Sequence, residues 1–197
     1  MSEAVRILDA EGADGLSMRR LAQQLGVTSP SLYKHFTNLE EVLEAVTEVI
    51  VSEIGTRPPR HEHWRAELAD LARRYFRVFQ RHPNAIRLVM RRPVRSATSL
   101  TGLDAVLQVL LESGWETRRA TRAVLLVESY ALGAAMTASS SGIPQGPELL
   151  EGRPALAAAL RGPHAEFRLA EEDFEHGLTL LLDGMERDDE PGPERAT

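Results

Sequence analysis

The sequence predicts an all-α protein, with an N-terminal three-helix helix-turn-helix domain and a larger C-terminal helical domain. Apolar residues recur at intervals of three and four along several segments, which is the spacing of an amphipathic helix. No segment shows the strict alternation of a half-buried strand. With 197 residues, 43% of them hydrophobic, the chain fits one large domain or a small one plus a medium one.

The first helix is predicted over Glu3–Glu11, and a short turn bracketed by Gly12 and Gly15 follows it. Its apolar stripe consists of Ala4, Val5, Ile7 and Leu8.

The segment Leu16–Phe36 predicts two short helices joined by a tight turn. Ser17 is a favourable N-cap for the first, because its hydroxyl can accept a hydrogen bond from a backbone N–H of the first turn. Gly26 ends that helix, since glycine adopts the left-handed conformation without strain. Thr28 is the predicted N-cap of the second helix, Ser29–Phe36, which would make about two turns.

The two faces of this second helix predict different surroundings. Leu32 and Phe36 are four residues apart, so they share a face and are expected to pack inward. Their predicted neighbours are Leu21, Leu25 and Val27. The opposite side carries Pro30, Tyr33 and Lys34, with Ser29 and Ser31 at its flanks. Hydroxyls and a cation on a short helix behind a glycine turn suit a reader of the DNA major groove.

The charge distribution supports this interpretation, although the net charge of −6 does not. No acidic residue occurs between Ser17 and Leu39, whereas Arg19, Arg20 and Lys34 all lie there. Lys34 is the only lysine of the chain. A local positive face on an acidic protein can bind DNA by neutralising phosphates and releasing counterions.

The string Leu21-Ala22, Leu25-Gly26-Val27-Thr28, Pro30-Ser31-Leu32-Tyr33 and His35-Phe36 resembles the N-terminal DNA-binding domain of the TetR family of transcriptional regulators. The resemblance covers about Ala4–Ile54. By position in the motif, it implies DNA contacts from Arg19, Thr28, Ser29, Pro30, Ser31, Tyr33, Lys34 and His35.

Two departures from the family pattern bear on affinity. Family members commonly carry a phosphate-binding lysine where this chain has Leu39, so weaker DNA binding is expected. They also usually have several residues, often basic, before the first helix, whereas only Met1–Glu3 are present here. Either those backbone contacts are missing or the true start lies upstream.

The next helix is predicted to begin after Asn38, which forms a capping-box-like pair with Glu41. Its apolar residues recur for about four turns, as far as Ile54. In the family, this helix links the DNA-binding domain to the body, so its tilt sets the spacing of the two heads of a dimer. The expected division is 1–54 for the DNA-binding domain, 55–63 for a proline-containing linker, 64–187 for the ligand-binding and dimerisation domain, and 188–197 for a flexible tail.

The larger domain shows further amphipathic segments. Helices are predicted over Trp64–Arg81, Ala85–Met90, a segment capped by Ser99 or Thr101 and ended by Gly114, Arg118–Ala138 capped by Thr117, Pro154–Leu160, and Ala170–Arg187. Arg118–Ala138 is apolar nearly all round, so it should be buried on more than one face.

The resemblance implies two further sites in this domain. A pocket for a small, largely apolar effector is expected among Trp64, Tyr75, Phe79, His82, Met90, Trp115 and Tyr130. In the family, the last two long helices meet their symmetry mates as a four-helix bundle. The residues expected at such a homodimer interface are Leu125, Leu132, Met136, Phe174, Leu178, Leu181 and Leu182.

Enzymatic, metal-binding and membrane classes find little support. A carboxylate-bridged metal bundle needs paired Glu-x-x-His motifs, and the chain offers one Asp173-x-x-His176. His61-x-His63 lacks a convergent third ligand. No catalytic motif, secretory leader or membrane-length apolar run appears, and there is no cysteine. We therefore expect no catalytic residues, no metal, no cofactor and a cytoplasmic location.

The leading hypothesis is a ligand-responsive regulator, more often a repressor in this family, that binds a near-palindromic operator in double-stranded DNA as a homodimer and is released by its effector. One alternative is a TetR-like binding or interaction protein that has lost sequence-specific DNA binding. Another is an all-α enzyme.

Overall fold

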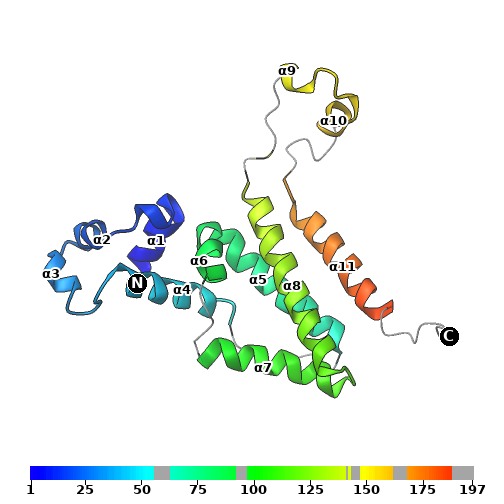
Figure 1. Ribbon diagram of the computed structural model, residues 1–197, viewed down its shortest axis with the longest axis horizontal. Coiled ribbons are helices and arrows are strands. Elements are labelled where there is room, and N and C mark those ends of the chain that lie inside the picture. Colours follow the sequence, from blue (N-terminus) through cyan, green and yellow to red (C-terminus); the bar gives the residue numbers. More distant parts are fainter. Residues whose placement is uncertain (56–62, 92–96, 141, 143–146, 162–167, 188–197) are drawn as a thin grey trace.

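The computed structural model describes residues 1–55, 63–91, 97–140, 142, 147–161 and 168–187, and no strand occurs among them (Figure 1). The predicted all-α class is therefore confirmed. The N-terminal helices lie at one end of the molecule, and α4 runs from them to the helical body (Figure 1). The predicted tail at 188–197 and most of the predicted linker lie outside the described residues.

The N-terminal unit consists of α1 (Ser2–Glu11), a 3₁₀ turn η1 (Ala13–Gly15), α2 (Met18–Leu25) and α3 (Ser29–Leu32). Ser17 caps α2 as predicted, accepting a hydrogen bond from the Arg20 N–H at 3.1 Å. Gly26 ends α2 with a left-handed φ of 66°. The Val27 N–H then reaches the Ala22 carbonyl at 3.0 Å, which completes a Schellman motif.

Helix α3 is shorter than predicted. It ends at Leu32, and Tyr33, Lys34 and His35 form a turn instead of a second helical turn. Asn38 adopts the extended conformation of the α4 N-cap, so the chain must leave the helix within a few residues of Leu32. Thr28 occupies the N-cap position of α3 as predicted, but its hydroxyl pairs with that of Ser31 at 3.1 Å and caps no backbone N–H.

Leu25 and Val27, predicted to be covered by Leu32 and Phe36, stay exposed. They are 46% and 44% exposed, whereas Leu21 and Leu32 are buried. A single-turn α3 is too short to cover the corner of the motif, so these two side chains stay on its surface.

Helix α4 (Leu39–Ser52) begins at the predicted capping box. The Asn38 side chain accepts from the Glu41 N–H at 3.0 Å, and the Glu41 carboxylate accepts from the Thr37 N–H at 2.6 Å. Val42, Val46 and Ile50 are fully buried. Because α4 contacts α1, α6 and α7, it belongs to both the N-terminal unit and the body.

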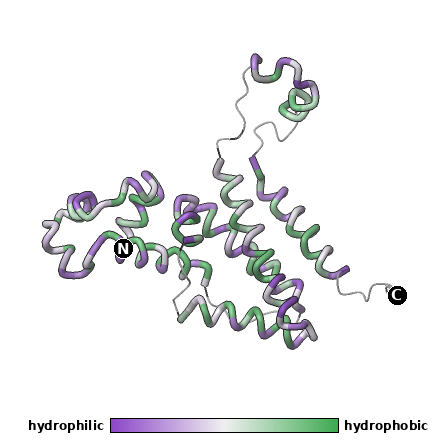
Figure 2. Tube along the Cα trace, in the orientation of Figure 1, coloured by the Kyte–Doolittle hydropathy of each residue, from purple (hydrophilic) through white to green (hydrophobic). Residues whose placement is uncertain are grey.

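The body is built on α5 (Trp64–Arg81) and α8 (Thr117–Ala138), which pack along their lengths. The other elements are η2 (Pro83–Ala85), α6 (Ile86–Arg91), α7 (Ala97–Glu112), α9 (Pro147–Leu150), α10 (Pro154–Ala159) and α11 (Glu171–Arg187). Apolar segments run along the packed helices in Figure 2. Phe76 of α5 stacks on Phe174 of α11 with ring centroids 4.0 Å apart, so the core joins the last helix to the first helix of the body.

The predicted bounds of α5 are confirmed, but two predicted caps in the body are wrong. Helix α7 begins at Ala97, ahead of both Ser99 and Thr101. Thr117 is the first residue of α8, and Glu116 occupies its N-cap position without a side-chain hydrogen bond. Where several hydroxyl residues lie near the start of a helix, the packing of the helix determines which residue comes first, because one N-cap contributes only about 1 kcal/mol.

Candidate nucleic-acid interface and body cavity

The eight predicted DNA-binding residues all belong to the α2–turn–α3 surface at the end of the molecule remote from the body (Figure 1). Ser29 and Ser31 are half-buried, and the other six are exposed. Tyr33 has 55% of its surface exposed. The structure therefore presents hydroxyl, aromatic and cationic groups on α2, the short α3 and the turn after it, a helix-turn-helix arrangement of the kind that enters a DNA major groove.

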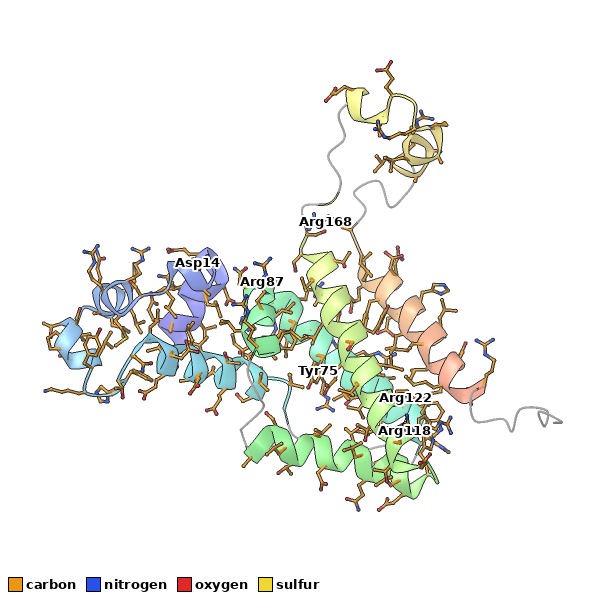
Figure 3. The ribbon with its side chains drawn as sticks, in the orientation of Figure 1. Asp14, Tyr75, Arg87, Arg118, Arg122 and Arg168 are labelled. Carbon is orange, nitrogen blue, oxygen red and sulfur yellow. The ribbon has the colours of Figure 1, made fainter. Side chains whose placement is uncertain are left out.

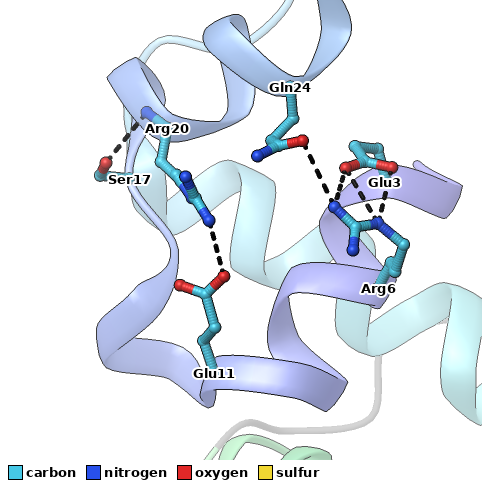
Figure 4. A network of polar contacts seen from close by, with 6 residues as sticks. All are labelled: Glu3, Arg6, Glu11, Ser17, Arg20 and Gln24. Atoms are coloured by element: carbon cyan, nitrogen blue, oxygen red, sulfur yellow. Dashed lines mark hydrogen bonds and ion pairs between the residues drawn. The ribbon is translucent and has the colours of Figure 1, made fainter.

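Polar contacts hold α2 against α1 (Figure 4). The Arg6 guanidinium donates to Glu3 at 2.6 Å and to Gln24 of α2 at 3.4 Å. Arg20 donates to Glu11 at 2.8 Å. Arg20 is therefore committed to fixing the helix pair, whereas Arg19 and Lys34 remain exposed for contacts outside the molecule.

A polar cluster joins the N-terminal unit to the body. His82, at the end of α5, places Nδ1 2.9 Å from an Asp9 carboxylate oxygen of α1 and Nε2 3.4 Å from Glu53 beyond α4. Asn84 donates from Nδ2 to the Leu8 and Asp9 carbonyls, each at 3.0 Å. His82, predicted to line the effector pocket, instead lies at this junction.

A small cavity of about 40 Å³ lies where the C-terminal end of α4 meets the body. It is lined by Val51, Ser52, Ile54, Gly55, Leu71, Arg74, Tyr75, Ser99, Gly102, Leu103 and Glu128. The Tyr75 hydroxyl donates to Glu128 Oε1 at 2.7 Å. Burial raises the pKa of Glu128, and the hydrogen bond from Tyr75 offsets part of that rise. Burial and the neighbouring Glu128 charge raise the pKa of Tyr75 as well.

Arg74 connects this cavity to α4. Its guanidinium donates to the carbonyls of Ile54 and Gly55, at 3.2 and 2.9 Å, and to the Asp70 carboxylate at 3.0 Å. The end of α4 is thus bonded to a side chain that also forms the cavity wall.

Of the predicted pocket residues, only Tyr75 lines this cavity. Trp64 and Trp115 pair with each other at 4.7 Å, and the Arg119 guanidinium lies 3.9 Å from the Trp115 ring centre. The remaining residues are also dispersed: Phe79 is fully buried in the core, Tyr130 donates to the Phe174 carbonyl at 2.9 Å, and Met90 is 69% exposed. Glu128 and Arg74 were missed, because nothing in their spacing separates them from surface charges.

A second, wider hollow of about 630 Å³ lies between the N-terminal unit and the body. Its walls are η1, η2, α6 and the C-terminal end of α8, and they include Asp14 and Arg87, both labelled in Figure 3. Because its walls come from both units, any change in their relative orientation alters its width.

The predicted dimer residues divide into two groups. Leu125 and Met136 are 57% and 48% exposed, and Leu132 and Leu181 are half-buried. Phe174, Leu178 and Leu182 are instead packed in the core of their own protomer, at most 3% exposed, so they offer no surface to a partner. Leu126 of α8 and Leu180 of α11 are 45% and 55% exposed and were missed, because runs of neighbouring leucines give no sequence signal of which one the core covers.

The described residues contain no group of three or more histidine or acidic side chains placed to hold a metal ion. None of the helices that they form combines the length and the apolar character needed to span a membrane.

Comparison with known proteins assigns this architecture to a family. Residues 1–46 match the family described as "Bacterial regulatory proteins, tetR family", and residues 57–188 match "Tetracyclin repressor-like, C-terminal domain". The chain is similar to the class A tetracycline repressor from transposon 1721 of Escherichia coli, with 31% identity covering 92% of this chain and 86% of that protein. It is also 31% identical to the HTH-type transcriptional repressor DrrR1 of Streptomyces coeruleorubidus over 67% of this chain and 49% of that protein.

Solved structures show the same fold. A possible TetR family transcriptional regulator from Streptomyces coelicolor A3(2) superposes with a TM-score of 0.75 at 28% identity, covering 95% of this chain and 97% of that one. The S. coelicolor TetR family protein ActR, in complex with actinorhodin, gives a TM-score of 0.72 at 26% identity, covering 95% and 94%.

The chain belongs to the TetR family of bacterial transcriptional regulators. It is a ligand-responsive DNA-binding regulator with an N-terminal helix-turn-helix domain and a C-terminal helical domain. Regulators of this family are generally not enzymes.

Proposed function

We propose that this regulator is a repressor that binds a near-palindromic operator as a homodimer. A single turn of helix contacts too few base pairs for specific binding. Two protomers place two α3 helices about one DNA turn apart, and together these helices read a longer site. The contacts are assigned to Arg19, Thr28, Ser29, Pro30, Ser31, Tyr33, Lys34 and His35. The exposure of six of them, and the position of all eight in α2, α3 and the turns that follow these helices, support this assignment.

The homodimer interface is proposed on α8 and α11. Leu125, Leu126 and Met136 of α8 and Leu180 of α11 are large apolar side chains between 45% and 57% exposed. Covering them removes apolar surface from water, which favours association by about 25 cal/mol per Å² buried. Phe174, Leu178 and Leu182 support the interface from behind by holding α11 on the core.

The proposed effector site is the cavity at the end of α4. The observation that carries it is the Arg74 bridge: Arg74 bonds the Ile54 and Gly55 carbonyls, two and three residues past the end of α4, and also lines the cavity. At about 40 Å³, the cavity is far smaller than an ordinary ligand pocket of roughly 300–1,000 Å³. A small, largely apolar effector must therefore part the helices around it and displace the end of α4.

That displacement changes the spacing of the two DNA-binding heads. An effector that prefers the displaced arrangement shifts the population away from the operator-binding form. A tenfold loss of operator affinity requires only about 1.4 kcal/mol of differential binding.

We infer that 1–54 carries DNA binding, 55–63 links it to the body, 64–187 holds the effector and the partner protomer, and 188–197 is a tail. The working compartment is the cytoplasm, because the chromosome that carries the operator lies there.

A gel-shift titration against the DNA upstream of the regulator's own gene tests the proposal. We expect a complex that withstands an excess of unrelated duplex at moderate salt and is released by an effector. Minocycline and actinorhodin, which occupy relatives of similar fold, are reasonable first ligands to test for release. Binding no tighter than to unrelated duplex at every salt concentration would refute operator recognition.

The alternative of a family member without DNA recognition has one observation in its favour. Leu39, at the position where relatives commonly carry a phosphate-binding lysine, packs half-buried against the core and has no charge to offer DNA. The same gel shift decides between the two, because this alternative retains effector binding and forms no specific complex.

A further inference from the structure

The middle of α8 places a carboxylate, Glu128, in the wall of the α4-end cavity. Glu128 is about half-way along α8, the helix that packs most closely against α5, and its side chain is half-buried there. Among the described residues its one hydrogen-bond partner is the Tyr75 hydroxyl, at 2.7 Å. One neutral donor does not saturate a carboxylate, which can accept about four hydrogen bonds.

No cation in the described part of the chain compensates this charge. Arg74 lines the same cavity, but its guanidinium is bonded to Asp70 and to the Ile54 and Gly55 carbonyls. Burial accordingly raises the pKa of Glu128, and no positive charge among the described neighbours lowers it. A half-buried carboxylate has lost part of its hydration and has no cationic partner among the residues that the structure describes, so a ligand that brings a positive charge recovers part of that cost on binding.

The other residues of the cavity wall determine which non-ionic groups of a ligand can bind there. Leu71 of α5 and Leu103 of α7 are apolar, as are Val51 and Ile54 at the end of α4. The part of a ligand that does not contact Glu128 therefore contacts aliphatic side chains.

A second uncompensated carboxyl lies on the same helix as Tyr75. Glu67 is one turn before Leu71 on α5, only 2% exposed, and its Oε2 has no hydrogen-bond partner among the described residues. Glu67 does not line the cavity, so it is a separate buried carboxyl group of the body.

We propose that the α4-end cavity is specific for an organic cation: an effector with an apolar body and one ammonium or amidinium group that pairs with Glu128. This inference rests on the proposed role of the cavity as the effector site, and it defines the chemical class of that effector. The cavity of about 40 Å³ accommodates the cationic group itself. The apolar body is what parts the helices.

Isothermal titration calorimetry with three ligands of matched shape tests the proposal. The ligands are the cation 2-phenylethylammonium, the neutral 2-phenylethanol and the anion 3-phenylpropanoate, each titrated into the full chain without DNA. We expect the cation to bind at least tenfold more tightly than the anion and the alcohol to fall between them. Absent binding of the cation, or equal affinities for cation and anion, overturns the proposal.

Variants test whether the cationic group of the ligand binds at Glu128. Glu128→Gln should lose at least tenfold in affinity for 2-phenylethylammonium and keep its affinity for the alcohol. Tyr75→Phe keeps the carboxylate and frees it from its one donor, so it should retain or strengthen cation binding. Glu48→Gln, at an exposed position of α4, is the matched control and should change nothing. If Glu128→Gln fails to fold, the ligand series on the original chain and on Tyr75→Phe still tests the preference for the cation.

The outcome is independent of operator binding. A specific gel-shift complex together with no preference for the cation refutes only the ligand class. A preference for the cation without any specific complex refutes the DNA-binding role and leaves the ligand class standing.

Discussion

His82 and Asp9 form a hydrogen-bonded pair, 2.9 Å apart, that ties the end of α5 to the end of α1. It is the polar part of a junction in which Asn84 also holds the last carbonyls of α1. The DNA-binding unit is therefore attached to the body through α4 and also through this junction. A displacement of α4 by an effector must work against the second attachment.

Breaking that attachment should loosen the two units from each other. His82→Ala removes the partner of Asp9 and leaves a half-buried carboxylate, so we expect a loss of about 1–3 kcal/mol in the free energy of unfolding. Urea denaturation measures the loss, and hydrogen exchange should show faster exchange in α1 than in α11. Equal exchange in both helices would mean that the pair stabilises the chain without coupling its units.

Lys34 should contribute to DNA affinity through phosphate contact. Lys34→Ala should weaken binding to specific and unrelated duplexes alike and reduce the slope of log affinity against log salt by about 1. Lys34→Arg keeps the charge and serves as the control, with a slope close to that of the original chain. An effect confined to the specific operator would assign Lys34 to base reading instead.

Glu128 should make stability depend on pH. Its pKa in the folded chain lies above the ordinary value of 4.5, so the folded state holds the proton more firmly than the unfolded state does. Glu128 therefore destabilises the fold as pH rises from about 4.5 through the raised pKa, and its contribution is constant above it. Thermal unfolding of Glu128→Gln should match the original chain at low pH and exceed it by about 1 kcal/mol at neutral pH. A stability difference that does not change with pH would contradict a half-buried carboxylate with a raised pKa.

Glu67 should also reduce stability. Glu67→Met replaces a buried carboxyl that has an unsatisfied oxygen with an apolar side chain of similar length, so chemical denaturation should show a gain of about 1–3 kcal/mol. Glu48→Met, on the exposed side of α4, is the comparison and should stay within about 0.5 kcal/mol. A loss of stability in Glu67→Met would show that the carboxyl has a favourable partner in solution.

The exposed leucines of α8 and α11 should control association. Leu125→Glu combined with Leu180→Glu places charges on the proposed interface, and sedimentation should then report a monomer. Neither side chain belongs to the protomer core, so helicity should be unchanged. A variant that remains dimeric would place the interface elsewhere on the molecule.

Local sequence was sufficient for the elements that depend on neighbouring residues. The Ser17 cap, the Gly26 left-handed turn, the Asn38–Glu41 capping arrangement and the bounds of α5 follow from contacts within a few positions. The charge pattern of the helix-turn-helix segment and its resemblance to the TetR family were also readable in the chain, because a surface that meets DNA directly is encoded in consecutive residues.

Only the tertiary structure decided which side chains share a site. The sequence predicted a pocket in which Tyr75 lies beside six aromatic, histidine and methionine residues. In the structure Tyr75 contacts Glu128, 53 positions away, and His82 contacts Asp9, 73 positions away. It also buries Phe174 and Leu178 while leaving Leu125 and Leu180 exposed. Helical periodicity fixes which residues share a face, and the packing of several helices at once determines which face becomes core, cavity wall or surface.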